Sequence, residues 1–240
     1  KYKQDVTIVI KERIQNTLVL GVLSYVILFI GALLLGLLCA WNENKFADRF
    51  IVRLGTITSC IPEFWMALML IFVFSVLLGW FPASGIGGWE YYVLPTVSLC
   101  FGGLATQARQ ARSSMLEVIR ADYVVTARSK GLTQREVILK HALPNALNPI
   151  ITLAGTNLAV IFGGSIVIEN VFSFPGIGQY MITAINQRDY PIVRGCVVML
   201  AVVFAVIMLL VDLCYAFNDP RIKARYENQG KKKKPSKEGK

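Results

Sequence analysis

The segment from Leu18 to Ala40 runs for 23 residues without a charged side chain, and it limits the possible folds more than any other feature. A helix needs about 20 apolar residues to cross the hydrocarbon core of a bilayer. The whole chain has 240 residues, 55% of them hydrophobic, and its mean hydropathy is +0.53. Because a soluble domain of this length could not bury so much apolar surface, we expect an all-α polytopic membrane protein.

Four further segments are interpreted as membrane-spanning helices. They are Phe64 to Phe81, Tyr91 to Ala108, Ala142 to Ile168, and Gly195 to Val211 with its continuation to Phe217. The span from Tyr91 is the most polar, so we expect it to pack inside the bundle. Glu63 precedes the second span. We expect it at the cytosolic end of that span, near Arg49 and Arg53, and the alternative is an intramembrane ion site.

Lysine and arginine residues indicate how these five spans are oriented. The segments 41–53, 109–141 and 218–240 fall on one side and hold 19 basic residues, whereas 1–17, 82–90 and 169–194 hold 6. Cytoplasmic loops carry the excess of basic residues, so the first set is predicted to be cytoplasmic. The net charge of +10 therefore reflects the inner membrane face and its anionic lipid rather than a nucleic-acid partner.

This topology divides the chain into three parts. We expect an external N-terminal arm (1–17), a transmembrane domain (18–217) with a cytosolic loop (109–141), and a basic cytoplasmic tail (218–240). No signal peptide would carry the short arm outward, so we expect a sixth, N-terminal helix in the parent protein. The alternative is a natural five-span protein whose short arm is translocated.

The cytosolic stretch from 121 to 144 is predicted to form two short helices. Asp122 suits the N-cap of the first, and Gly131 suits the left-handed position that ends it. Thr133 and Glu136 have the spacing of a capping box, which opens a second helix that leads toward Pro144.

The first of these helices carries an apolar edge that it cannot bury alone. Tyr123, Val124 and Ala127 form the edge. It fits a groove on a partner protein, or it lies on the bilayer surface with Arg128 and Lys130 on lipid phosphates. The pattern alone leaves both possibilities open.

Three stretches of sequence resemble the peptide/nickel permease family of ATP-binding cassette (ABC) importers. They are "DYVVTARSKGL" followed by "HALPNAL", "IENVFSFPGIGQYMITAINQRDYPIV" at 168–193, and "VDLCYAFNDPRIK" at 211–223. The likeness extends from about Gln15 to Arg221 and implies the fold of a type I ABC importer permease. It also implies a second, similar permease, two cytosolic ATPase subunits, an extracytoplasmic solute-binding protein and a bacterial or archaeal cell membrane.

In that family a short coupling helix docks into the ATPase. The resemblance implies that this role falls on Asp122, Tyr123, Val124, Ala127, Arg128, Lys130 and Gly131. The chain departs from the family pattern, called the EAA loop, at two positions. Val125 stands where the loop has its glutamate, and Thr126 stands where it has its first alanine.

A polar stripe marks the fourth span as the candidate translocation path. Asn145, Asn148, Thr152 and Thr156 recur at steps of three, four and four residues, which places them on one helix face. Such a stripe faces either a path for cargo or a closely packed neighbouring helix, because it is unsuited to lipid.

The chain lacks the sequence motifs of an ATPase or a hydrolase. It has no GxxxxGK[ST], HExxH or GxSxG motif, so we expect no enzyme activity and no cofactor, with ATP bound by a partner subunit. The predicted function is an importer permease for small peptides or for nickel as a chelate, and the short outer connection at 82–90 favours nickel. The alternative is an ion-driven secondary transporter, which should show inverted repeats and intramembrane charges.

Overall fold

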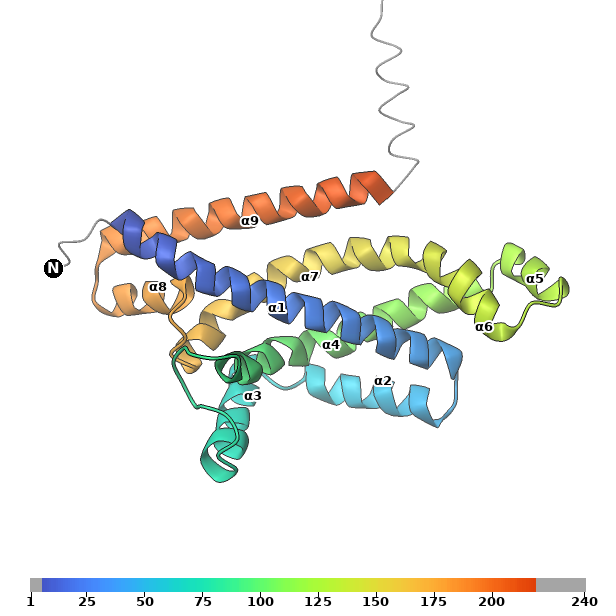
Figure 1. The fold of residues 1–240 in the computed structure, drawn as a ribbon, viewed down its shortest axis with the longest axis horizontal. Helices are drawn as coiled ribbons and strands as arrows, with labels where there is room; N and C mark the ends of the chain where they lie inside the picture. The colour runs from blue at the N-terminus through green and yellow to red at the C-terminus, as the bar shows by residue number, and fades with distance from the viewer. Residues whose placement is uncertain (1–5, 219–240) are drawn as a thin grey trace, which may run out of the picture.

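The structure is a computed structural model that describes residues 6–218, with the side chains at 6, 7, 148, 152–154, 156, 159, 212 and 214–218 outside the description. The described part is helical and contains no strand. Its elements are α1 (Val6–Trp41), α2 (Phe46–Ser59), α3 (Glu63–Leu70), the π-helix η1 (Ile71–Leu77), α4 (Glu90–Ile119), α5 (Asp122–Ser129), α6 (Gln134–Glu136), the π-helix η2 (Val137–Ala142), α7 (Leu143–Val171), α8 (Ile177–Asn186) and α9 (Tyr190–Asn218). The long helices α1, α4, α7 and α9 run along the long axis of the molecule (Figure 1).

Helix α4 is the centre of the bundle, as its polarity predicted. It contacts α1, α2, α3 and α7. Small residues allow the close approach: a Cβ added at Gly36 of α1 would lie 2.5 Å from the Cβ of Ala111. Four polar residues of α4 are buried, and one of them, Ser98, donates a hydrogen bond to the Leu94 carbonyl oxygen at 2.8 Å. Burial inside the bundle therefore explains why this span tolerates so many polar groups.

Two described helices are long and apolar enough to cross a membrane, Ile8–Trp41 and Tyr190–Val211. A third span is counted if the bent pair Phe46–Ser59 and Glu63–Leu77 crosses as one unit. The predicted spans in α4 and α7 are also helical, and among the described residues of α7 the stretch Val160–Val171 forms a shorter apolar helix.

The second predicted span differs most from the structure. Its chain bends by 100° between α2 and α3, and its helix ends at Leu77 rather than at Phe81. Pro62 has extended backbone angles at the N-cap of α3, and a proline cannot continue the preceding helix without losing a hydrogen bond. Helix α1 begins at Val6, so it is longer at its start than the apolar run predicted from Leu18.

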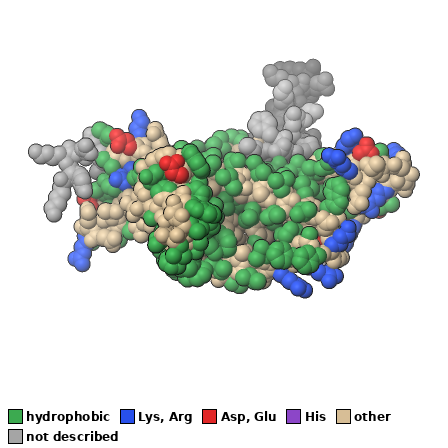
Figure 2. Space-filling view, turned by 60° about the horizontal axis from the view of Figure 1, so that its bottom comes forward, with side chains coloured by type: hydrophobic (Ala, Val, Ile, Leu, Met, Phe, Trp, Pro, Cys, Tyr) green, Lys and Arg blue, Asp and Glu red, His purple; other side chains and the backbone are tan. Residues whose placement is uncertain are grey.

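The charged side chains gather at the two ends of the molecule, and hydrophobic side chains cover most of the surface between them (Figure 2). Many large apolar residues of α1, α3, η1 and α9 are exposed. An apolar belt of this size on a helical bundle is the surface expected to face lipid.

The short helix α8 spans Ile177–Asn186 and lies between α7 and α9 along the chain. Its first backbone N–H, from Ile177, donates to Thr17 Oγ1 at 2.9 Å. The next two, from Gly178 and Gln179, donate to Glu169 Oε2 at 2.7 and 3.2 Å. Side chains of α1 and α7 thus cap α8, whose start would otherwise leave these donors unpaired.

Candidate docking helix and translocation cavity

Helix α5 begins one residue earlier than the sequence predicted. Ala121, with extended backbone angles, is the N-cap, and no side chain caps the helix. Asp122 is therefore the first helical residue and not the N-cap, so that prediction is wrong. Its carboxylate still lies in the first turn, where it faces the positive end of the helix dipole.

The turn after α5 agrees with its sequence prediction. Gly131 has φ +81°, and an added Cβ would meet nothing within 4 Å. The demand for glycine is therefore conformational and does not come from crowding. The capping box is also confirmed. Thr133 Oγ1 accepts the Glu136 N–H at 3.3 Å, and Glu136 Oε2 accepts the Thr133 N–H at 3.2 Å. Hydrogen bonds from Thr133, together with the charge of Lys140, lower the pKa of Glu136.

The apolar edge of α5 is divided between burial and exposure. Val124 and Ala127 are buried in a cluster with Val137 and the partly buried Leu132. These two residues therefore need no partner protein to cover them, because the turn at Gly131 brings Leu132 and Val137 of the same chain against them. Tyr123, by contrast, is 45% exposed.

The outward part of α5 is here called the docking surface. It consists of the exposed residues Asp122, Tyr123, Val125, Thr126, Arg128 and Lys130. Both acidic and basic side chains lie beside an aromatic ring on this surface. Such a mixture suits a protein partner, because charged groups orient the contact and the ring supplies apolar area.

A partly buried ion pair that the sequence did not predict joins α2 and α4. Arg112 of α4 binds Asp48 of α2 through Nε–Oδ1 at 2.6 Å and Nη2–Oδ2 at 2.7 Å. The backbone N–H of Asn44 also donates to Asp48 Oδ2, at 2.9 Å. A bidentate pair of this kind fixes both side chains. A second pair, Arg120 to Glu43 at 2.6 Å, joins α4 to the turn between α1 and α2.

The predicted polar stripe of α7 is only partly visible. The side chains of Asn148, Thr152 and Thr156 lie outside the described residues, so their role stays a prediction. Asn145 is exposed, and its Nδ2 donates to the His141 carbonyl oxygen at 2.9 Å. At 100° per residue the described residues Pro149, Gly163 and Val167 share its face, and all three are exposed. This face of α7 is therefore open in the single chain.

A cavity of about 410 Å³ lies where the bend between α2 and α3 meets α4 and α7. Its polar lining residues include Glu63, Gln107, Thr106 and Asn157. The expectation that Glu63 lies near Arg49 is wrong. Arg49 is in the first turn of α2 and Glu63 follows its last turn, and a helix of 14 residues measures about 21 Å.

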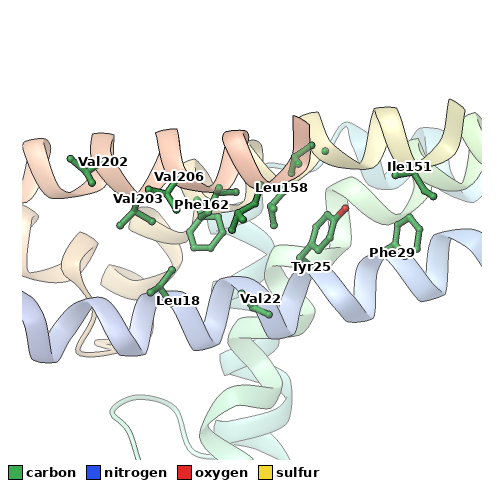
Figure 3. A pocket seen from close by; sticks show the side chains of 14 residues that line it. Leu18, Val22, Tyr25, Phe29, Ile151, Leu158, Phe162, Val202, Val203 and Val206 are labelled. Carbon is green, nitrogen blue, oxygen red and sulfur yellow. The ribbon is translucent and has the colours of Figure 1, made fainter. Parts of the chain in front are cut away.

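A second, larger hollow of about 720 Å³ lies between α1, α7 and α9. Figure 3 shows Leu18, Val22, Tyr25 and Phe29 of α1 facing residues of α7 and α9 across it. Among the described residues that line it there is no charged side chain, and the Tyr25 hydroxyl is the only side-chain hydroxyl. We call it the apolar groove; its lining suits acyl chains rather than a polar cargo.

The fold and the two hollows define a class of protein. The chain is a multi-pass helical membrane protein with a polar cavity, a charged docking surface at one end and no ATP-binding motif in its sequence. This combination is that of a membrane transport subunit. Residues 32–224 match the family described as "Binding-protein-dependent transport system inner membrane component", and the chain belongs to this family.

Two of the similar proteins carry names that refer to peptide transport. The chain is 45% identical over 204 residues to the dipeptide transport system permease protein DppB of Bacillus subtilis (strain 168), covering 85% of this chain and 66% of that protein. It is 36% identical over 214 residues to the glutathione transport system permease protein GsiC of Escherichia coli (strain K12), covering 89% and 70%. The chain thus spans about two thirds of the length of these relatives.

A solved structure shares the fold. A chain of the MetNI methionine ABC transporter in an inward-facing conformation superimposes with a TM-score of 0.75 at 19% identity, covering 91% of this chain and all of that one. The sequence-based expectation of a type I ABC importer permease fold is therefore confirmed.

Proposed function

We propose that this chain is the permease subunit of an ABC importer for small peptides. Membership of the binding-protein-dependent transport family is the observation that carries the proposal. It favours an ATP-driven importer over the ion-driven transporter considered from the sequence. The named relatives transport a dipeptide and glutathione, so peptides are favoured over nickel as the cargo.

Three partners follow from this function. The docking surface on α5 would bind a cytosolic ATPase subunit, because its exposed charged and aromatic groups stand away from the bundle. The open face of α7 around Asn145 and Gly163 would pack against a second permease, and the translocation path would run between the two. A solute-binding protein would deliver cargo at the opposite end, near α8.

Orientation in the cell membrane is part of the proposal. The excess of basic residues supports a cytoplasmic position for the docking surface and the C-terminus. A reporter fused after Lys240 should be cytoplasmic, and one inserted near Gly87 should be external. Both reporters on the same side would contradict the odd number of crossings that this topology requires between them.

Transport itself tests the function. The chain is reconstituted in proteoliposomes with its second permease, ATPase subunits and binding protein, and uptake of an equimolar dipeptide mixture is measured by mass spectrometry. Uptake that requires both ATP and the binding protein is expected. Uptake that follows an ion gradient without ATP would refute the proposal.

A further inference from the structure

The cavity at the bend between α2 and α3 is the strongest candidate for direct contact with cargo. Its volume of about 410 Å³ lies within the range of about 300–1,000 Å³ that is common for small-molecule sites. Val160 of α7 lines the cavity and is 64% exposed. The cavity therefore opens beside the exposed face of α7, where a second permease would complete its wall.

Glu63 places a carboxylate in this cavity without a basic partner. None of the ion pairs among the described residues includes it. Its oxygens lie against glycine backbone: a Cβ added at Gly164 of α7 would be 2.8 Å from Oε2, and one at Gly102 of α4 would be 3.8 Å from Oε1. An acidic group within an apolar bundle is costly and is normally paired. A cationic group on a ligand would supply the missing charge.

Gln107 provides a second, independent indication of a ligand. Its side chain lines the same cavity and the residue is only 6% exposed. Among the described residues its Nε2 has no hydrogen-bond partner. A buried amide donor left unpaired costs about 1–3 kcal/mol, so a carbonyl or carboxylate oxygen on a ligand would satisfy it.

We propose that Glu63 binds the N-terminal ammonium group of a peptide cargo and that Gln107 donates a hydrogen bond to one of its carbonyl oxygens. Every unmodified peptide carries both groups whatever its side chains, because the α-amino group has a pKa of about 8. This assignment rests on the proposed function and adds the chemical groups that the path recognises. The described lining residues of the apolar groove include neither a carboxylate nor an amide side chain.

The test uses the complete transporter in proteoliposomes and two probes, an equimolar dipeptide mixture and the same mixture N-acetylated. Uptake of each peptide is divided by its occupancy on the binding protein, which removes selection at that earlier step. The variants are Glu63→Gln, Glu63→Asp and Gln107→Leu. Glu90→Gln, which changes a glutamate outside the cavity, is the control.

Glu63→Gln should lower uptake of free dipeptides by about tenfold or more, because truncating one partner of a charged hydrogen-bonded pair is costly. Glu63→Asp should restore part of that uptake, Gln107→Leu should lower it, and Glu90→Gln should leave it unchanged. Glu63→Gln should also abolish the preference for free over N-acetylated peptides, with the ATPase subunits still bound.

Three results would overturn the assignment. They are parental uptake by Glu63→Gln, an equal loss for free and N-acetylated peptides, and loss of the ATPase subunits from that variant, which would indicate a structural role. The proposed function fails separately, if the unmodified transporter takes up no dipeptide with ATP.

Discussion

Helices α5 and α8 are both short connectors between long helices, yet the chain anchors them in opposite ways. The start of α8 is bonded to side chains of α1 and α7, and Glu169, which caps it, is 0% exposed. The start of α5 has no side-chain cap, and most of its residues are exposed. The difference indicates that α8 belongs to the packed structure, whereas the outer surface of α5 stays open in the single chain.

The space around the two turns shows the same contrast. A Cβ added at Gly176, before α8, would collide with the Glu169 carboxylate, so this glycine is required by packing. A Cβ added at Gly131, after α5, would meet nothing, so this glycine is required by its backbone angle alone. Changes near α8 should therefore affect stability, and changes near α5 should affect coupling.

The largest expected effect is from Glu169→Ala. The backbone N–H groups of Gly178 and Gln179 would lose their acceptor, at about 1–3 kcal/mol for each buried donor left unpaired. We expect a loss of about 2–4 kcal/mol in unfolding free energy, measured by thermal unfolding of the purified protein in detergent. Glu12→Ala, at an exposed glutamate of α1, is the control and should change little. Equal melting temperatures for the two variants would show that α8 is not anchored by this cap.

Gly131→Val should have a smaller effect on stability and a larger one on transport. A left-handed backbone conformation costs about 1–2 kcal/mol at a residue that has a Cβ. We expect this cost to be higher for valine than for alanine, because valine is branched at Cβ. We expect the variant to insert and fold, but to lose ATP-driven uptake because α5 no longer meets the ATPase at the required angle. Gly131→Ala should be milder.

The chain offers a matched control for this variant. Gly79 also has a left-handed backbone, with φ +64°, and an added Cβ there would also meet nothing within 4 Å. Gly79→Val should therefore carry a similar strain while keeping uptake. If both variants lose uptake equally, the loss is caused by backbone strain in general. The turn at Gly131 would then have no special role in coupling.

The smallest expected effect is from Thr133→Ala, which removes the capping box. Hydrogen bonds from Thr133 hold the pKa of Glu136 below its ordinary value of 4.5. A carboxyl group whose pKa is lowered by folding stabilises the folded state above its unfolded pKa, and this contribution is lost as pH falls through the folded pKa. The melting temperature of the variant should be slightly below that of the parent at neutral pH. This difference should narrow below pH 4.5. A difference in melting temperature that does not depend on pH would mean that the charge of Glu136 contributes no stability through the capping box.

Local chemistry made several features of this structure predictable from sequence. Uncharged runs mark the long helices, Gly131 marks a left-handed turn, and Thr133 with Glu136 marks a helix start. Each of these features depends on residues a few positions apart. Their geometry follows from propensity and capping, without knowledge of what the chain packs against.

The features that were missed join distant parts of the chain. Asp48 binds Arg112 of α4, and Glu169 of α7 caps α8 beside Thr17 of α1. Glu63 was expected near Arg49 because the hydropathy pattern does not show that α2 is a separate helix, which ends at the bend before Glu63. Only the packed bundle brings these groups together.

The central claim is that α5, unlike α8, binds the ATPase that powers transport. It is tested most directly by photocrosslinking of the complete transporter in native membranes, with benzoylphenylalanine in place of Tyr123 on the docking surface or of Tyr190 at the opposite end. Both tyrosines are exposed, at 45% and 70%. The account predicts an adduct with the ATPase subunit from position 123 and none from position 190. Adducts only with lipid from position 123 would contradict it, and would make α5 a helix of the membrane surface.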